Sequence, residues 1–315
     1  MTVSGLDPEM LIAAIRGAHI EPCLLGTPPT PSRIARLMCP RVCLDFATLG
    51  PALHFNGEMA RSCYTLIFVL ASLTKARSFN FASEYTDGYM GFYPPGSVAD
   101  AVTPEGYANA TLTVPVADFH TALALHFPEV PEKVLRSGAG MRIGEVEQTC
   151  LRGLLAPLED SMWHSPELFA ESPVRRQIEG ELLAAFLAAM RSGCADLVPP
   201  PTNRAGGRLR LLRKARDFFA AHTHAPIQLD DLCTSLGLTR RGVENLFQDL
   251  LGISPITYLR HQRLHGARSA LLKAAPASGA VKFAALEWGF LHQGRFAHDY
   301  HALFGEKPSD TLQRA

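Results

Sequence analysis

The stretch from Leu229 to Phe304 constrains the fold most, because it contains two copies of one short pattern. Each copy is a segment with apolar residues at helical spacing, then a glycine, then a second amphipathic segment. In the first copy Gly237 supplies the turn, and Thr239 stands where a helix N-cap belongs. After this cap, apolar residues recur at i, i+3, i+4 and i+7, as on the buried face of a helix: Val243, Leu246, Phe247 and Leu250. We therefore predict a helix-turn-helix unit here.

The second copy, residues 281–304, predicts another such unit. Its first segment ends at Gly289, and its second has a buried stripe of Phe296, Tyr300, Leu303 and Phe304. Between the copies, Ser254 and Pro255 predict the start of a long helix that runs to about Lys273 and fixes the separation of the two units. Two such units are suited to successive major grooves of DNA, about 34 Å apart. Helix pairs that merely pack on a core show the same pattern, so this motif alone leaves an ordinary helical domain open.

Charge is divided unevenly along the chain. The formal net charge is zero, with 30 basic and 30 acidic residues among 315. Residues 208–315 hold 15 of the basic and 9 of the acidic residues, so the first 207 hold 15 and 21. A basic module joined to an acidic one fits a nucleic-acid reader joined to a second function, although a chance partition of this size remains open.

Residues 41–116 predict a sandwich or barrel of short strands. The candidate strands are rich in β-branched and aromatic residues and are separated by turn residues at intervals near 8–12: residues 41–46, 52–56, 64–70, 76–81, 88–93 and 110–116. From Ala117 the period becomes helical, with candidates at residues 118–127, 144–163 and 174–190. The apolar stripe of the last candidate suits either the core or a contact with a second subunit.

The domain organisation follows from these periods. We predict an N-terminal arm over residues 1–36, a β-domain with following helices over 37–191, a linker over 192–207 and a helical domain over 208–315. The linker is assigned because it contains three consecutive prolines from Pro199 and two glycines from Gly206. The predicted fold class is α+β with two domains.

The C-terminal third resembles the DNA-binding domain of the AraC/XylS family of bacterial transcription regulators. The resemblance rests on Gly237-Leu-Thr-Arg-Arg, Leu246-Phe247, Leu251-Gly-Ile-Ser-Pro255, Tyr258-Leu259, Arg263-Leu264, Ala267-Arg268, Leu271-Leu272, Trp288-Gly-Phe290, Phe296, Tyr300, Phe304-Gly305, Pro308-Ser309 and Arg314. Two departures, Leu291-His292 and Arg295, concern the target sequence rather than the fold. The resemblance implies a double helix-turn-helix domain preceded by a cupin-like β-barrel.

The same resemblance implies the function and the partners. We expect a sequence-specific regulator, in the family's usual mode an activator, controlled by a small-molecule effector bound in the N-terminal domain. Its partners would be double-stranded DNA, RNA polymerase and a second copy of the chain as a homodimer. A ligand-independent regulator, controlled by a partner protein or by expression level, is the alternative.

Matching the family motif assigns the DNA contacts. The candidate DNA-binding residues are Arg240, Arg241, Glu244, Asn245 and Gln248 in the first unit and Gln293, Arg295 and His298 in the second. Arginine pairs with guanine, asparagine and glutamine pair with adenine, and glutamate accepts from cytosine. Arg240 is expected at phosphates, as are Arg260, Lys273 and Lys282.

For the effector pocket we expect an aromatic lining with one polar group for orientation. The candidates are Arg61, Phe79, Phe81, Tyr89 and Tyr93, each of which could equally belong to the core. No histidine lies between Phe55 and Phe119, so we expect no metal and no cofactor in this domain.

The sequence also bears on whether the protein is an enzyme. Cys39 and Cys43 are similar to half of the zinc site of a cysteine methyl acceptor fused to a reader of this type, but no Cys-x-x-Cys completes it. The chain has no P-loop or nucleophile elbow, so we expect no enzyme. The seven scattered cysteines, the lack of a leader pattern and the lack of an apolar run of about 18 residues predict a cytoplasmic protein with no membrane span.

Overall fold

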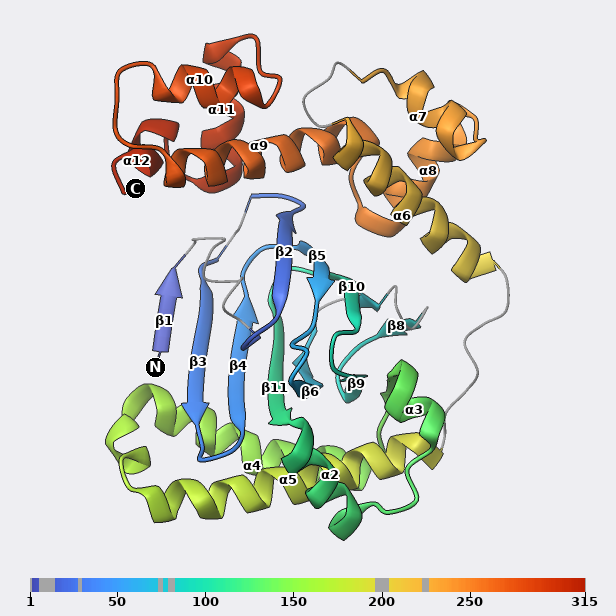
Figure 1. Ribbon diagram of the computed structural model, residues 1–315, viewed down its shortest axis with the longest axis vertical. Helices are drawn as coiled ribbons and strands as arrows, with labels where there is room; N and C mark the ends of the chain where they lie inside the picture. The colour runs from blue at the N-terminus through green and yellow to red at the C-terminus, as the bar shows by residue number, and fades with distance from the viewer. Residues whose placement is uncertain are drawn as a thin grey trace. The chain divides into compact units, whose positions relative to one another are not determined.

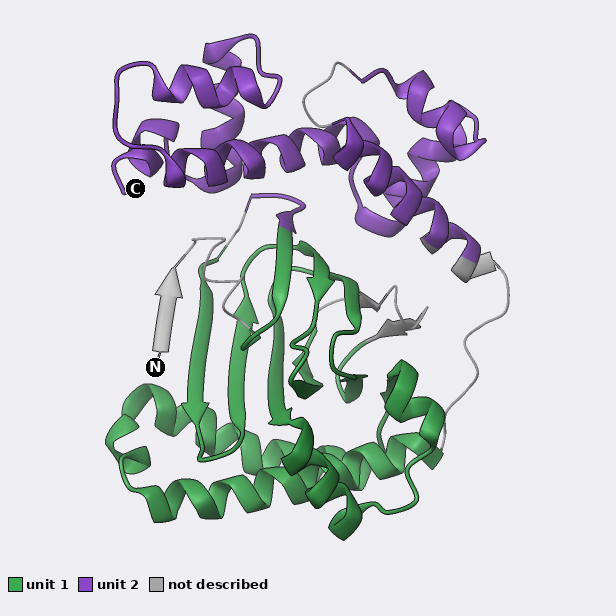
Figure 2. Ribbon diagram, in the orientation of Figure 1, with its two compact units in different colours: residues 1–22, 29–200 green, residues 23–28, 201–315 purple. Residues whose placement is uncertain are grey.

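The computed structural model describes residues 2–5, 15–27, 30–72, 76–78, 83–195, 204–222 and 227–314. The chain forms two compact units (Figure 2). Unit 1 consists of Met1–Pro22 and Pro29–Pro200, and unit 2 of Cys23–Pro28 and Pro201–Ala315. Within the described residues, no helix has the length and apolar character that crossing a membrane requires.

Unit 1 is built on two β-sheets. The seven-stranded sheet has the order β1 (Thr2–Gly5), β3 (Ser32–Met38), β4 (Cys43–Leu49), β11 (Tyr107–Pro115), β6 (Cys63–Ala71), β9 (Tyr89–Tyr93) and β12 (Ala139–Arg142). The five-stranded sheet has the order β2 (His19–Leu24), β5 (Leu53–Glu58), β10 (Val98–Thr103), β7 (Ala76–Ser78) and β8 (Ser83–Tyr85). Pairing is antiparallel along the β3, β4, β11 and β6 ladder, with Phe46 opposite Ala110 and Leu66 opposite Leu112.

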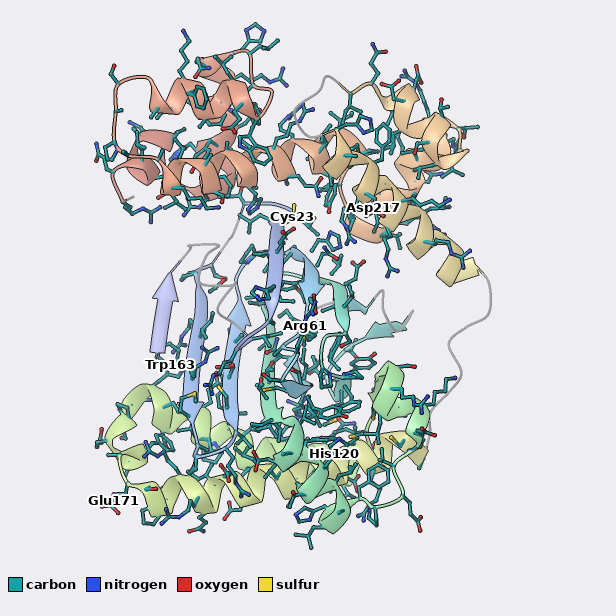
Figure 3. All side chains as sticks on the ribbon, in the orientation of Figure 1. Cys23, Arg61, His120, Trp163, Glu171 and Asp217 are labelled. Carbon is teal, nitrogen blue, oxygen red and sulfur yellow. The ribbon has the colours of Figure 1, made fainter. Side chains whose placement is uncertain are left out.

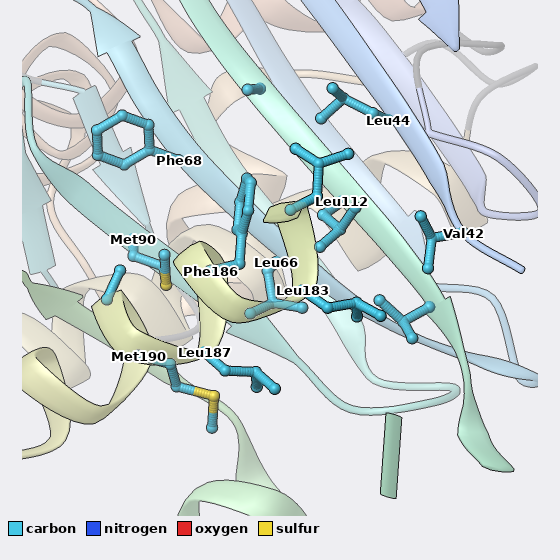
Figure 4. Close-up of a cluster of buried hydrophobic side chains, with 14 of the residues drawn as sticks. Val42, Leu44, Leu66, Phe68, Met90, Leu112, Leu183, Phe186, Leu187 and Met190 are labelled. Atoms are coloured by element: carbon cyan, nitrogen blue, oxygen red, sulfur yellow. The ribbon is translucent and has the colours of Figure 1, made fainter. Parts of the chain in front are cut away.

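Helices cover one face of the larger sheet (Figure 1). They are α2 (Val116–His126), α3 (Glu132–Ser137), α4 (Glu145–His164) and α5 (Ser172–Ala195), with a 3₁₀ turn η1 at Pro166–Phe169. Alternate residues of the strands, such as Leu66 and Phe68, pack against α5 residues such as Phe186 (Figure 4). The apolar stripe of α5 is therefore used within unit 1, and of the two roles predicted for it the structure supports the core.

The predicted strands and helices of unit 1 have observed counterparts, but the structure adds more. Strands β1 and β2 and most of β3 lie within residues 1–36, where we predicted an arm, and β10, β12 and α3 lie in gaps between the predicted elements. These strands were missed because their residues are atypical: β3 carries Arg33 and Arg36, and β10 is half alanine and aspartate. Helices α5 and α6 extend into the predicted linker. The likeness of the β-domain to a cupin remains a prediction.

Unit 2 contains the predicted pair of helix-turn-helix units. Its helices are α6 (Arg204–Ala221), α7 (Leu229–Leu236), α8 (Arg240–Leu251), α9 (Pro255–Lys273), α10 (Ala280–Glu287), α11 (Gln293–Phe304) and α12 (Pro308–Leu312). Figure 1 shows α7 and α8 near one end of α9 and α10 and α11 near the other. The start of α9 is as predicted, because Ser254 Oγ accepts a hydrogen bond from the Thr257 N–H at 3.1 Å.

Close packing of α9 against the second unit depends on a glycine. A Cβ at Gly266 would lie 2.1 Å from Cζ3 of the Trp288 ring, so no side chain fits without moving the indole. We expect Gly266→Ala to lower the free energy of unfolding of unit 2 by about 1–3 kcal/mol through overpacking, despite the better helix propensity of alanine. Gly294→Ala in α11 is the matched control, because nothing described lies within 4 Å of its Cβ position. Urea unfolding followed by Trp288 fluorescence measures both, and equal stability of the two variants would contradict the packing argument.

Candidate functional site

Helix α8 is fixed in place by its caps and its buried face. Thr239 Oγ1 accepts a hydrogen bond from the Gly242 N–H at 3.1 Å, as predicted for an N-cap. Gly237 has a φ of 66°, the left-handed conformation that the turn requires. The residues buried on α8 are Val243, Leu246, Phe247 and Leu251, so Leu251 takes the deeper place that we predicted for Leu250.

The opposite face of α8 presents polar side chains. Arg241, Glu244, Asn245 and Gln248 are all exposed, as their positions between the buried ones predict. The Gln248 amide donates to the Gly252 carbonyl at 3.2 Å and so helps to end the helix. Arg241, Glu244 and Asn245 therefore form the first candidate reading surface.

Arg240 is engaged within the protein. Its guanidinium makes two hydrogen bonds to the Asp230 carboxylate, at 2.7 and 2.8 Å. The pair raises the pKa of Arg240 and lowers that of Asp230, because each ion stabilises the charge of the other. Asp230 thus holds Arg240 at the start of α8, where it would meet a phosphate as a positioned rather than a mobile cation.

Helix α11 carries an acidic residue that lies between two arginines and a histidine. Asp299 lies 3.7 Å from Arg260 Nε, 3.8 Å from Arg295 Nε and 3.5 Å from His298 Nδ1. Arg295 and His298 are exposed, whereas Gln293 is half-buried and its Nε2 has no partner among the described residues. The structure therefore brings Arg295 and His298 together around Asp299, and it leaves Gln293 less available than we predicted.

Helix α9 sets the spacing of the two units. Its 19 residues span about 28 Å at about 1.5 Å per residue. This length approaches the roughly 34 Å that separates successive major grooves on one side of DNA. Whether both recognition helices meet the same face of a duplex remains a prediction.

Unit 1 contains a cavity between its two sheets. The larger sheet contributes Tyr89, Tyr93 and Tyr107 to the lining, and the smaller contributes Phe55 and Thr103. The cavity has a volume of about 80 Å³. Tyr89 and Tyr93, two of the candidate pocket residues, line this cavity because they share the strand face opposite to the one that packs on α5. Whether they contact an effector remains a prediction.

Of the other three predicted pocket residues, the structure describes only Arg61. Arg61, labelled in Figure 3, is 83 % exposed and donates to Glu58 at 2.6 Å, and it is not one of the cavity-lining residues. Phe79 and Phe81 lie outside the described residues. The lining residues that we missed include Phe55, Thr103, Tyr107 and Asn109. Phe55 could have been found as an aromatic residue within a predicted strand, whereas Tyr107, Thr103 and Asn109 lie between the predicted strands and nothing in the sequence singles them out.

The cysteines give no support to the methyl-acceptor alternative. Cys39 and Cys43 are buried, and burial raises their pKa to about 11 and about 12. A methyl acceptor needs a thiolate, which these surroundings disfavour. Within the described part of the chain, no cluster of three or more residues with metal-binding side chains occurs.

Comparison with known proteins agrees with this geometry. A family profile described as "Helix-turn-helix domain" matches residues 232–314, which include both helix pairs. The chain is similar to the "XylDLEGF operon transcriptional activator" of Pseudomonas putida, with 38% identity over 274 residues, 86% of this chain and 82% of that protein. It is also similar to the "Probable thc operon regulatory protein" of Rhodococcus erythropolis, with 36% identity over 151 residues. That second match spans 47% of this chain and 44% of the relative.

Solved structures with related sequences or shapes include two regulators. A probable AraC family transcriptional regulator from Rhodopseudomonas palustris is 38% identical, with a TM-score of 0.32, over 34% of this chain and 97% of its own. The AraC-like transcriptional activator CuxR is 14% identical, with a TM-score of 0.40, over 91% of this chain and 98% of its own.

Proposed function

Because the chain belongs to the AraC/XylS family of DNA-binding transcription regulators, we propose that it activates transcription under the control of a small molecule bound in unit 1. The observation that carries the DNA-binding part is the pair of amphipathic helices, α8 and α11, at opposite ends of α9 with exposed polar faces. The observation that supports effector control is the cavity between the two sheets of unit 1.

DNA would be read by two helices, α8 and α11, that present different side chains to the bases. On α8, Arg241 suits guanine, Asn245 suits adenine and Glu244 suits cytosine. On α11, Arg295 and His298 share Asp299, which weakens their attraction for phosphate and favours contacts to base edges in defined orientations. Arg240, held by Asp230, would fix the register of α8 on the backbone. We propose double-stranded DNA, RNA polymerase and a second copy of the chain as the partners.

The first test replaces Arg241 by alanine. We expect a loss of about 1–3 kcal/mol in binding at one base position of the operator and a relaxed preference there, because one bidentate contact is removed. The measurement is a gel-shift titration of the full-length protein against an operator selected from genomic DNA and its single-base variants. Arg136→Ala is the control, because Arg136 is an exposed arginine of α3 paired with Glu132 in unit 1. Unchanged affinity and preference in Arg241→Ala would remove α8 as a reading helix.

Effector control has a separate test. Reporter transcription from that operator should depend on a small molecule that also raises the melting temperature of the protein. Transcription that responds to the level of the protein, with no compound raising its melting temperature, would favour the ligand-independent alternative.

A further inference from the structure

Leu291 is a large apolar side chain that stands uncovered just before helix α11. It is 77% exposed and lies two residues before Gln293, the first residue of the helix. An apolar residue at this place often packs against the fourth residue of the helix, which here is Phe296. In this chain Phe290 packs on that ring instead, with the two ring centres 5.0 Å apart. Packing onto α11 therefore does not account for a leucine at position 291.

The first helix-turn-helix unit places the corresponding leucine differently. Leu238 also lies two residues before its helix, α8, which begins at Arg240, but Leu238 is half-buried. Its Cβ lies 3.5 Å from the place that a Cβ on Gly242 would take, so it packs over the start of α8. The leucine before the second helix of each pair is thus turned toward the protein in the first unit and toward solvent in the second.

The first turn of α11 leaves space around this leucine. The second residue of α8 is Arg241, whereas the second residue of α11 is Gly294, and nothing described lies within 4 Å of the Cβ position of this glycine. Gln293 is half-buried. His292 is exposed and makes no side-chain hydrogen bond that caps the helix. Where α8 presents a guanidinium, α11 therefore presents a gap that is preceded by an exposed leucine.

The major groove of DNA offers an apolar side chain one specific partner. Thymine displays a 5-methyl group on its groove edge, and the other three bases do not. In a helix-turn-helix protein, the residues at the start of the helix that enters the groove contact the base edges. A leucine at that place buries apolar surface against a thymine methyl group and has no hydrogen bond to offer the polar groups of the other bases.

We propose that Leu291 is a specificity-determining residue that contacts the 5-methyl group of one thymine in the half of the operator bound by α11. The assignment rests on the proposed DNA-binding function and adds a base contact of a kind that the polar residues Arg295 and His298 do not supply. The contact buries about one methyl group, so its loss should weaken binding about fourfold. It involves no phosphate, so this factor should not change with salt concentration.

Deoxyuridine in place of single thymines tests the contact, because it removes the methyl group and leaves the base pairing intact. The measurement is a gel-shift titration of the full-length protein against an operator selected from random DNA, with each thymine replaced in turn. We expect the wild-type protein to bind about fourfold more weakly when one thymine of the α11 half is replaced. Leu291→Ala should bind the unmodified operator at least about fourfold more weakly and should lose nothing further with deoxyuridine at that position. The base position at which Arg241→Ala relaxes the preference marks the other half.

Two variants make the test specific. Leu291→Met keeps a long apolar side chain and should retain the deoxyuridine effect. Leu125→Ala removes a leucine of α2 that is also 77% exposed, and it should leave both the affinity and the deoxyuridine effect unchanged. The melting temperatures of all three variants should match that of the wild-type protein, since exposed side chains contribute little to stability.

Contrary results separate this contact from DNA binding itself. A deoxyuridine effect that keeps its full size at every thymine in Leu291→Ala would overturn the role of Leu291. A wild-type protein that responds to deoxyuridine at no thymine of the α11 half would overturn it as well. In both cases operator binding and the base preference lost in Arg241→Ala would stand. If the wild-type protein selects no sequence from random DNA, the proposed function fails and the thymine contact fails with it.

Discussion

Glu306→Gln is expected to lower the free energy of unfolding of unit 2 by about 3–5 kcal/mol, because it leaves the buried cation of Arg268 without its carboxylate. Arg268 is 3% exposed, and its guanidinium pairs with Glu306 and lies 5.0 Å from the centre of the Phe304 ring. Glu306 also accepts from Thr311 and from Arg314, each at 2.5 Å. The carboxylate therefore joins α9 to α12 and to the end of the chain.

Unfolding in urea of the full-length protein measures this loss. The chain has two tryptophans, so a Trp163→Phe background makes the fluorescence of Trp288 report on unit 2. The double variant Arg268→Met/Glu306→Gln should recover part of the stability, because it removes the buried charge together with its partner. Asp249→Asn, which breaks the exposed pair with Arg208, should change stability by less than about 1 kcal/mol. A loss in Glu306→Gln no larger than in this control would show that the buried charge is solvated in another way.

The sequence predicted unit 2 well because its signals are local. Thr239 and Ser254 cap the helices where the pattern placed them, and Gly237 takes the left-handed conformation. Each amphipathic helix has one buried face, so its period identifies the face that points outward. What remained hidden was pairing between side chains distant in the sequence, such as Asp230 with Arg240, because hydrophobic spacing carries no information about it.

Unit 1 was harder to predict because its central strands are buried on both faces. In β4 six of seven residues are buried, and in β9 all five are, so the period of two disappears. The sequence therefore identified the strands but could not tell whether Phe68 or Tyr89 faces the cavity. The structure separates them, with Phe68 against the helices and Tyr89 in the lining. We expected Arg61 to orient a ligand in the pocket, but its side chain instead pairs with Glu58 at the surface. The composition of the strands did not indicate this pair.

Acid should weaken unit 2 through a histidine that must stay neutral. His265 Nε2 accepts a hydrogen bond from the Leu24 N–H at 3.0 Å, and His261 Nδ1 lies 2.8 Å from the Leu24 carbonyl. Burial, together with smaller effects of the neighbouring His261 and Arg268, lowers the pKa of His265 from 6.5 to about 3. Protonation would turn the acceptor toward Leu24 into a second donor, so the folded state resists it. Within unit 2, these two contacts join Leu24 to α9.

Stability falls with falling pH because the pKa of His265 is lower in the folded state than in the unfolded state. Above pH 6.5 His265 is neutral in both the folded and the unfolded state, so its contribution is complete; as the pH falls, the unfolded state takes up the proton first and stability is lost. We expect a loss of up to about 1.4 kcal/mol per pH unit below that value, or about 2–3 kcal/mol between pH 6.5 and 4.5. Urea unfolding at several pH values, followed by Trp288 fluorescence, gives this slope. His265→Gln keeps an acceptor without a proton equilibrium and should flatten the slope, whereas His301→Gln at an exposed position of α11 should not. Equal slopes in the two variants would assign the acid sensitivity to other groups.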